Sequence, residues 1–412
     1  MTLLQWIAKK TSFTAIFFSV FSAYHSSSLA AAFQFYELGT PIIGSAGVGQ
    51  AAVAMDASTA YFNPAGMTQL ATSEFMLGSQ MLLPIITFAA DNRVNTFSGD
   101  NGGNAGYLVP GLAIYDVISC TPKLKLGISL TSPYGGLLNY NDGWVGRYYV
   151  QNLELLTLNL NPALAYKIGD HFSVGAGVSL EYGNLHQTNG IPLPRVTDGQ
   201  INVKVHSEAP GFNAGILFTP NELSNIGIAY RSQITHHFHG IANFLRINTE
   251  PSVSTELIMP QNIISSIKFH VNPKLSVLGE AGWSNWSTLN NPTVTIDGFS
   301  LVSHIAWHDT FRVGLGWQYQ LSPLMLWQAG VSYDSSPTNS RNRLPDLPMD
   351  RQIRAGTGLI LSIYKIVQLA FSYEFIDFGK APIESITRIG TLAGYYNRNY
   401  ANVLQVSVNL AL

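Results

Sequence analysis

The nine residues Val367-Gln-Leu-Ala-Phe-Ser-Tyr-Glu-Phe375 alternate between two kinds of side chain. The odd-numbered positions hold Val, Leu, Phe, Tyr and Phe, and the even-numbered positions hold Gln, Ala, Ser and Glu. Successive side chains of a β-strand point to opposite faces, so the stretch predicts a strand with one apolar and one polar face. The same alternation occurs in Lys123–Leu130 and in Leu404–Leu412. A pairing shift of one residue would exchange the two faces, so the register is strongly specified.

The composition says where such strands could lie. Only 11% of the 412 residues are charged, whereas 46% are hydrophobic and 11% are aromatic. A soluble domain carries about 25% charged residues. After the first thirty residues, no stretch supplies the ~20 apolar residues that a spanning helix needs. A closed β-barrel is the remaining way to satisfy the backbone in lipid while showing an apolar exterior. The net charge of -2 predicts no nucleic-acid partner.

The turns and loops between the strand-like segments support a barrel. Short turns such as Gly169-Asp170, Asn272-Pro273 and Ser322-Pro323 alternate with longer polar stretches. The longer stretches are expected as loops near residues 91–106, 187–206, 287–300, 335–349 and 379–399. Tight turns at one end and long loops at the other are typical of outer-membrane barrels. We therefore predict an all-β fold, a transmembrane antiparallel β-barrel of about fourteen strands over residues 73–412.

The first thirty residues predict export. Lys9 and Lys10 precede an apolar run from about residue 13 to 24, and Ser28-Leu29-Ala30 ends the segment. A basic start, a short apolar core and a small-x-Ala ending are typical of a secretory signal peptide, which we assign to residues 1–30. A membrane anchor is the alternative, but the apolar run is too short for one. An exported barrel is expected in the bacterial outer membrane.

One stretch fits neither a signal nor a strand: Asp56-Ala-Ser-Thr-Ala-Tyr-Phe-Asn-Pro-Ala-Gly-Met67. Asn63-Pro64 predicts a helix start, because Asn caps free backbone N–H groups and Pro at the first helical position loses no hydrogen bond. Small residues at Gly47–Ala54 could pack closely against a wall. The lumen of a barrel of this size is too wide for side chains alone to fill. Residues 31–72 are therefore expected to form an N-terminal hatch, a plug with short helices.

With these residues in view, the chain resembles the FadL family of outer-membrane transporters for long-chain fatty acids and other hydrophobic compounds. The stretch Asp56–Met67 is the most specific match and resembles the hatch motif of the family. Further matches follow in the family's order along nearly the whole exported chain: Ala31–Gln34, Trp144–Tyr149, Asn161–Tyr166, Tyr333–Pro337 and Leu347–Arg351. The resemblance implies a fourteen-stranded barrel plugged by its N-terminal segment.

The resemblance also implies a route for the ligand. A hydrophobic molecule is caught at the outer surface, moves to a pocket beside the hatch, and leaves sideways through a break in the third strand. The matching residues are Ser132, Pro133, Tyr134, Gly135 and Gly136. Proline cannot donate to a strand ladder and paired glycines weaken one, so strand pairing is expected to fail there. An ordinary strand-ending turn is the alternative.

Two groups of hatch residues are candidates for function. The motif residues Asp56, Asn63, Pro64, Ala65 and Gly66 could form an element that moves to open the path, or a rigid cap that only holds the plug.

The second group is the mature N-terminus. Phe33 and Phe35 could reach the ligand pocket, or they could belong to a frayed chain end.

Other features are weaker. Asp350 and Arg351 could form an ion pair in the lumen, or an exposed pair in a loop. In His236-His-Phe-His239, two histidines would share a strand face, which is too few ligands for a metal site. Some family members carry a basic residue near the outer end of the fifth strand. The matching stretch here is Gln187–Asn189, with Arg195 nearby but not aligned.

These observations predict a transporter that binds hydrophobic molecules and releases them laterally into the bilayer. Its expected partners are a long-chain fatty acid or similar ligand, outer-membrane lipid and, during biogenesis, the barrel assembly machinery. No cofactor, metal or catalytic residue is predicted, and the lone Cys120 forms no intrachain disulfide. The alternatives are a porin for hydrophilic solutes, an outer-membrane lipid-modifying enzyme, or an adhesin that uses the outer loops.

Overall fold

The computed structural model describes residues 34–193, 198–245, 249–289, 293–302, 306–364, 366–387 and 390–412. The segment predicted as a signal peptide lies outside these ranges. Most of the described chain is β-structure, joined in one twenty-stranded sheet. The strands are β1 (Glu74–Ala90), β2 (Val109–Ser119), β3 (Leu124–Thr131), β4 (Gly135–Asn139), β5 (Asn152–Ile168), β6 (Phe172–Ile191), β7 (Gly199–Asn221), β8 (Ser224–Arg231), β9 (Ile234–Leu245), β10 (Ser252–Met259), β11 (Asn262–Asn272), β12 (Leu275–Ser284), β13 (Thr293–Ile296), β14 (Phe299–Val302), β15 (Thr310–Ser322), β16 (Met325–Asp334), β17 (Gln352–Ile363), β18 (Val367–Asp377), β19 (Ile383–Ile386) and β20 (Thr391–Ala411).

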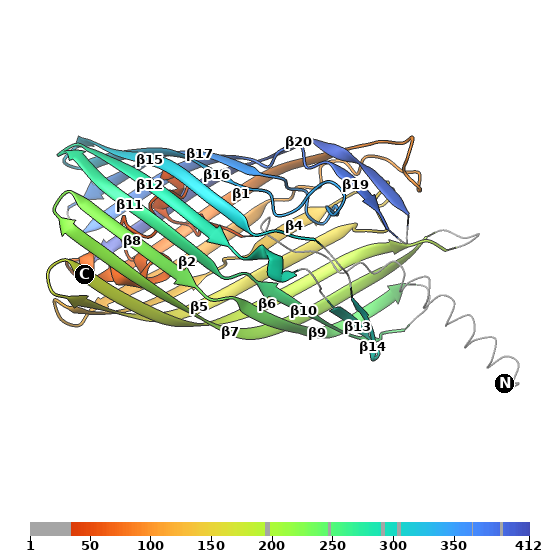
Figure 1. Ribbon diagram of the computed structural model, residues 1–412, viewed down its shortest axis with the longest axis horizontal. Coiled ribbons are helices and arrows are strands. Elements are labelled where there is room, and N and C mark those ends of the chain that lie inside the picture. Colours follow the sequence, from red (N-terminus) through yellow and green to blue (C-terminus); the bar gives the residue numbers. More distant parts are fainter. Residues whose placement is uncertain are drawn as a thin grey trace, which may run out of the picture.

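The sheet closes on itself as a barrel of fourteen antiparallel strands (Figure 1). β1 pairs with β20, from Glu74 opposite Ala411 to Ala90 opposite Gly394, with one register shift near Thr87. Three barrel strands are interrupted and therefore consist of two segments each: β3 with β4, β8 with β9, and β10 with β11. The predicted fold class and number of strands are confirmed. No helix among the described residues is long and apolar enough to cross a membrane.

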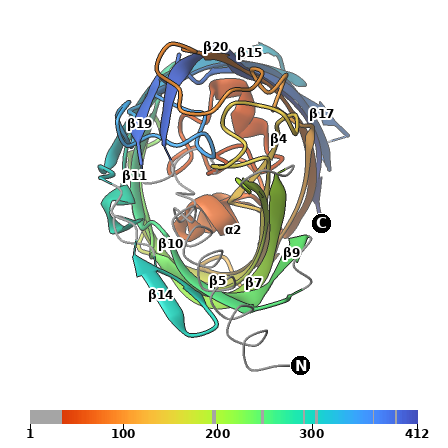
Figure 2. The ribbon, with the colours of Figure 1, turned by 90° about the vertical axis from the view of Figure 1, so that its right-hand side faces the viewer.

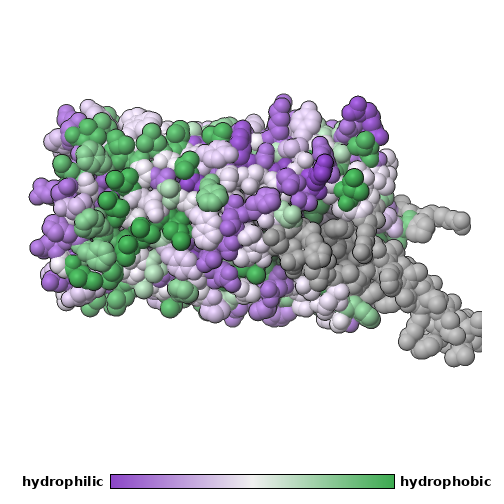
Figure 3. Space-filling model, in the orientation of Figure 1, coloured by the Kyte–Doolittle hydropathy of each residue, from purple (hydrophilic) through white to green (hydrophobic). Residues whose placement is uncertain are grey.

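The two faces of the wall follow the alternation in the sequence. On β3, Leu126 and Ile128 are exposed on the outside, whereas Lys125 and Ser129 are buried inside. On β18, Phe371 and Tyr373 likewise face outward. Figure 3 shows the hydrophobic residues gathered over the half of the barrel that carries the short turns. This half presents an apolar band to lipid, and the other half has a more polar exterior.

The connections are short at one end of the barrel and long at the other (Figure 1). The predicted loop over residues 187–206 is wrong in extent, because β6 continues to Ile191 and β7 begins at Gly199. Inward-facing Leu185, Val203 and Val205 are buried and keep the strands amphipathic. The outward residues there are polar because these strands extend beyond the apolar band. The long connections also contain the 3-10 helix η4 (Trp286–Leu289) and the β13–β14 hairpin.

The segment between Gln34 and Ser73 lies inside the barrel (Figure 2). It contains the 3-10 helix η2 (Pro41–Ser45), the α-helical turn α2 (Thr59–Phe62) and the 3-10 helix η3 (Pro64–Gln69). η2 contacts β15, β16, β17, β18 and β20, whereas η3 contacts β3, β5, β6 and β7. The plug therefore reaches from one side of the wall to the other.

Glycines on the inner wall let the plug backbone come unusually close. A Cβ atom on Gly227 of β8 would collide with the carbonyl group of Ala51, and one on Gly330 of β16 would collide with that of Ser45. No other residue could occupy these positions without displacing the plug. The wall and the plug therefore fit each other at the level of the backbone.

Candidate functional site

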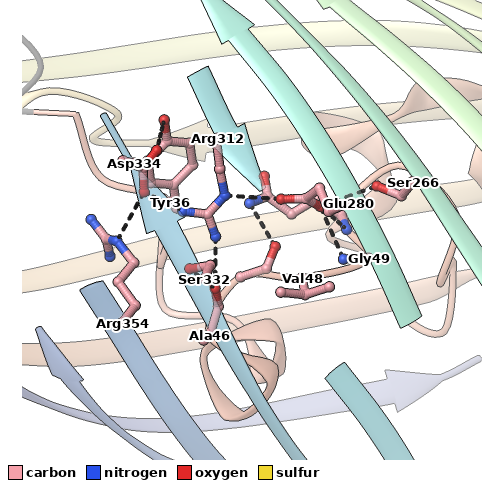
Figure 4. A network of polar contacts seen from close by, with 12 residues as sticks. Tyr36, Ala46, Val48, Gly49, Ser266, Glu280, Arg312, Ser332, Asp334 and Arg354 are labelled. Carbon is pink, nitrogen blue, oxygen red and sulfur yellow. Dashed lines mark hydrogen bonds and ion pairs between the residues drawn. The ribbon is translucent and has the colours of Figure 1, made fainter. Parts of the chain in front are cut away.

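A buried ionic network fixes the first half of the plug, residues 36–50, to the wall (Figure 4). Arg312 of β15 pairs with Glu280 of β12 at 3.0 Å and with Asp334 of β16 at 2.8 Å. Its Nη2 donates to the carbonyl oxygen of Ala46 in the plug at 2.6 Å. The other oxygen of Glu280 accepts the backbone N–H groups of Gly49 at 2.9 Å and of the next residue at 3.1 Å. Each wall charge is thus compensated, and the pairs also hold plug backbone.

A second arginine extends this network. Arg354 of β17 pairs with Glu37 of the plug, and its Nη1 lies 3.4 Å from Glu374 of β18. Tyr36 lies between the two arginines, with its ring 4.3 Å from the guanidinium of Arg312 and 5.1 Å from that of Arg354. Its hydroxyl donates to Asp334 at 3.3 Å. The start of the plug is therefore held by charge.

The second half of the plug, residues 56–70, is held mainly by neutral contacts. The side chain of Asn63 accepts from the backbone N–H of Ala65 at 3.1 Å, and Pro64 is the first residue of η3, so the predicted helix start is confirmed. The Asn63 amide also donates to the carbonyls of Ala51 at 2.7 Å and of Ile216 in β7 at 3.0 Å. The side chain of Asn63 thus connects the second half of the plug both to the preceding part of the plug and to the wall.

Asp56 and Gly66 shape the same half of the plug. Asp56 is buried and accepts hydrogen bonds from the backbone N–H and the hydroxyl of Ser58. Burial raises the pKa of Asp56, and the two bonds from Ser58 only partly oppose that rise. Gly66 lies against Ala54 and Thr59, where a Cβ would be tight. Both residues support the fold of the plug, and neither reaches the pocket described below.

The wall is interrupted at the predicted place. β3 ends at Thr131 and β4 begins at Gly135, so three residues lie opposite two on β5, which is a bulge of one residue. β3 pairs with β2 only as far as Ile114, and β4 forms no ladder with β2. Within the described chain, Val109–Ala113 of β2 therefore has no strand partner on that side. Gly135 and Gly136 themselves pair with β5, so the interruption is narrower than predicted.

The start of the plug covers this interruption. The backbone N–H of Phe35 donates to the carbonyl oxygen of Pro133 at 2.8 Å, and Gln34 forms a β-bridge with Tyr134. A Cβ atom on Gly135 would lie 2.9 Å from the ring of Phe35. The predicted ligand residue Phe35 and the predicted opening are therefore in direct contact. Phe33 lies outside the described residues.

A pocket lies between the plug and the wall beside this contact. Its cavity volume is about 40 Å³. Aromatic side chains from the plug and from the interruption form much of its lining. The lining includes Phe35, Tyr61, Phe62, Tyr134, Asn213, Arg231 and Asn262. Tyr134 also belongs to the large apolar cluster beneath the outer loops, which includes the stacked rings of Tyr140 and Trp144 at 4.0 Å.

The other predicted residues lie elsewhere. Asp350 pairs with Arg343 at 2.9 Å and Arg351 pairs with Asp377 at 3.0 Å, so the predicted pair between Asp350 and Arg351 is not formed. The two residues are adjacent, and their side chains point to different neighbours.

The histidines of β9 lie on both faces of the wall. His237 and His239 are exposed outside, whereas His236 is buried inside. The described residues contain no cluster of three or more metal-ligating side chains. Of the basic positions discussed above, Arg195 lies outside the described residues.

Sequence reasoning did not single out the buried charges of the wall. Arg231, Glu280, Arg312, Asp334 and Arg354 all occupy inward positions of strands. In a chain with 11% charged residues, charged positions on the polar face of a strand are a usable signal. Alternation places them inside the barrel, but it does not say which ones meet the plug.

A closed fourteen-stranded wall, an apolar outer band and an internal plug define an outer-membrane barrel of the plugged, transport type. The chain belongs to the family described as outer membrane protein transport protein (OMPP1/FadL/TodX), whose profile matches residues 21–411. It is 26% identical to the long-chain fatty acid transport protein of Salmonella typhi, covering 89% of this chain and 93% of that one.

Solved structures show the same fold. A FadL homologue from Pseudomonas aeruginosa superposes with a TM-score of 0.85 at 20% identity, covering 92% of this chain and 100% of that chain. The toluene transporter TbuX of Ralstonia pickettii gives a TM-score of 0.70 at 18% identity, covering 92% and 100%. At these identities the structural likeness concerns the fold.

Proposed function

We propose that the chain carries hydrophobic small molecules across the outer membrane by binding them in the pocket beside the plug and releasing them sideways into the bilayer. The observation that carries the proposal is that the pocket and the interruption of the wall share residues. Pro133 and Tyr134 line the pocket and also form the bulge between β3 and β4. A ligand in the pocket is therefore separated from lipid by one irregular stretch of wall and by Phe35.

The surroundings of the interruption favour an apolar cargo. The unpaired stretch of β2 contains Pro110, which has no N–H group, and Leu112, which is 69% exposed on the outside. An alkyl chain gains about 0.8 kcal/mol for each CH₂ group removed from water. A path from the aromatic side chains of the pocket through an apolar rim into lipid keeps much of that gain. A long-chain fatty acid and an aromatic hydrocarbon both fit this reasoning, in line with the transporters to which the chain is similar.

The plug favours a transporter of hydrophobic molecules over a porin for hydrophilic solutes. Residues 34–73 cross the lumen and are bonded to opposite sides of the wall. Planar-bilayer recordings of the purified protein should show no large, steady, ohmic conductance. Channels of that kind would instead support a porin. We propose a passive carrier and assign no catalytic step; hydrolysis of ester lipids by the purified protein would favour the enzyme alternative.

Position 135 offers a test of the exit. Gly135→Arg would place a long side chain against Phe35, where even a Cβ is close, and should block the opening. We expect uptake of a radiolabelled long-chain fatty acid by cells to fall at least tenfold, while heat-modifiable migration in gels shows an intact barrel. Gly135→Ala is the matched control, because a methyl group needs only a small shift of the ring. Normal uptake by a folded Gly135→Arg protein would refute this exit.

The remaining assignments complete the proposal. We propose residues 1–30 as a cleaved signal, residues 31–72 as the plug and residues 73–412 as the barrel. The lipid of the outer membrane would receive the cargo, and the barrel assembly machinery would insert the chain. A mature N-terminus at Ala31, measured by mass spectrometry of the purified protein, would support the first boundary; retention of residues 1–30 would contradict it.

A further inference from the structure

Three exposed histidines lie on one patch of the outer face of the wall. His206 belongs to β7, and His237 and His239 belong to β9. Along β7 the outward residues change from Phe212, which is in the apolar band, to Glu208 and His206 toward the outer end. The patch therefore lies just outside the apolar band, where hydrated ions can reach the wall.

Two of these imidazoles face each other across neighbouring strands. His206 lies directly opposite His239 in the ladder between β7 and β9, and the centres of the two rings are 4.6 Å apart. Two imidazole nitrogens that each bind one tetrahedral Zn²⁺ at about 2.1 Å lie roughly 3.4 Å from each other. Rings at the observed separation can reach that spacing through small side-chain rotations, so the pair is placed to chelate a metal ion.

The backbone of β9 orients one of the two rings as a ligand. Nδ1 of His239 lies 3.3 Å from the carbonyl oxygen of His237. A carbonyl oxygen only accepts, so Nδ1 carries the proton in this contact and Nε2 keeps its lone pair. Metal-binding histidines almost always donate their other ring N–H group to a carbonyl or carboxylate in this way. Nε2 of His239 is therefore the nitrogen that is free to bind a metal.

The charges around the pair favour a cation. Glu256 of β10 lies opposite His237 in the ladder, and its Oε2 is 3.4 Å from Nδ1 of that ring. Glu208 lies two positions from His206 on the same outward face of β7, and Lys204 lies two positions away on the other side. Two carboxylates thus outweigh one ammonium group beside neutral imidazoles. This balance suits a metal cation better than the anionic head group of a lipid.

We infer that His206 and His239 bind a divalent transition-metal ion on the outer surface of the barrel. Imidazole ligands suit Zn²⁺, Cu²⁺ and Ni²⁺, whereas Mg²⁺ and Ca²⁺ prefer oxygen. No third ligating side chain converges with the pair in the described part of the chain, so water completes the coordination. An ion bound there ties β7 to β9 in the outer region, where the ladder of β7 has passed from β8 to β9. The site is separate from the pocket beside the plug and does not depend on the proposed function.

A calorimetric titration with Zn²⁺ tests the site. The full-length protein is purified without a histidine tag and kept in a buffer free of chelators. Wild-type protein should bind Zn²⁺, and His206→Gln and His239→Gln should each bind it roughly tenfold or more weakly. His171→Gln is the matched control, because His171 is also exposed and its Nδ1 also lies near a backbone carbonyl, that of Thr219 at 2.8 Å. It lies in the turn between β5 and β6, away from the patch, and its loss should leave the affinity unchanged.

The control decides between a defined site and general binding to surface histidines. An equal loss of affinity in all three variants, or no loss in His206→Gln and His239→Gln, would overturn the assignment. The absence of Zn²⁺ binding by the wild type would overturn it as well.

Electron paramagnetic resonance of bound Cu²⁺ reports the ligands directly. The wild-type spectrum should show coupling to two imidazole nitrogens, and each single variant should show coupling to one. A general change in the wall that weakens binding without removing a ligand would not alter this number. A spectrum that is the same in the wild type and in His239→Gln would contradict the pair as the site.

Discussion

The two halves of the plug are attached to the barrel in different ways. Residues 36–50 lie against β12, β15, β16 and β17 and are held by arginines and carboxylates. Residues 56–70 lie against β3, β5, β6 and β7 and are held by apolar packing, by the amide of Asn63 and by a hydroxyl contact between Thr68 and Ser173 at 2.7 Å. Arg231 and Lys125 also donate to backbone carbonyl groups of this half, but neither pairs with a carboxylate of the plug. The pocket proposed to bind the ligand lies where the two halves meet, beside the interruption of the wall.

This difference has an energetic meaning. A buried ion pair gives little net stability compared with an apolar pair, but removing one partner leaves an uncompensated charge and is strongly destabilising. Neutral hydrogen bonds and packing can be broken and remade at lower cost. We therefore expect the first half of the plug to be the fixed part, and the second half to be the part that yields when a ligand enters.

The largest expected effect concerns the fixed half. Arg312→Leu leaves Glu280 buried without its cation and Asp334 with only the more distant Arg354 at 3.8 Å, and should lower the free energy of unfolding by about 3–5 kcal/mol. Urea unfolding followed by tryptophan fluorescence measures the change. The matched control is Arg351→Leu, which breaks a half-exposed pair with Asp377 and should cost about 1 kcal/mol or less. Equal losses in the two variants would break the distinction between the halves.

The next largest effect concerns the residue that joins the halves. Asn63→Ala removes the cap of η3 and the donor to Ala51 and Ile216, and should cost about 2–4 kcal/mol. Hydrogen–deuterium exchange should show faster exchange in residues 56–70 and little change in residues 36–50. Thr68→Val, which removes a single hydroxyl contact, serves as the control. Faster exchange confined to residues 36–50 would contradict the proposed division.

A smaller effect is expected from the close contact with the wall. Gly227→Ala places a methyl group against the carbonyl of Ala51 and should cost about 1–3 kcal/mol through displacement of the plug. Gly282→Ala is a matched change on an inner strand position, where a Cβ has ordinary contacts of at least 3.4 Å. Thermal unfolding should separate the two variants. Identical melting temperatures would show that the plug has room to move away from β8.

The smallest effect is a dependence on pH in the yielding half. The pKa of buried Asp56 is raised, so the folded plug binds this proton more tightly than the unfolded chain does. Stability is therefore greatest below the unfolded pKa of about 3.9 and falls as pH rises through the higher native pKa, by at most about 1.4 kcal/mol per pH unit. Asp56→Asn should remove this slope from exchange rates of residues 56–70. An unchanged slope would assign it to another group.

Much of the fold follows from the sequence, because the alternation within each barrel strand shows which side chains face the lipid and which face the lumen. The alternation in residues 367–375 and 123–130 fixes which side chains meet lipid, and low charge excludes a soluble surface. The outer ends of β6 and β7 were harder to predict. There the outward residues are polar, as in a loop, and only the buried inward residues such as Val203 and Val205 reveal a strand.

The site was less predictable than the fold. The helix start at Asn63-Pro64 is local, so backbone chemistry alone indicates it. The ionic partners of the plug are separated from it by 266 residues for Ala46 and Arg312, and by 317 for Glu37 and Arg354. Strand alternation puts these arginines inside the barrel, but the orientation of the plug within the lumen determines which plug residues they contact. Asp350 and Arg351 do not pair with each other, because Arg343 and Asp377 lie nearer to their charged groups.

The ionic wall has a consequence for a barrel whose plug has been lost. Glu280, Asp334 and Glu374 would then line one side of an open tunnel together with Arg312 and Arg354, whereas Lys125, Arg231 and Glu181 would line the other side, so that acids and bases balance. Charged rings in a pore select permeating ions by sign. Deletion of the plug should therefore produce a leak with little preference for either sign of ion, visible as a reversal potential near zero in a salt gradient.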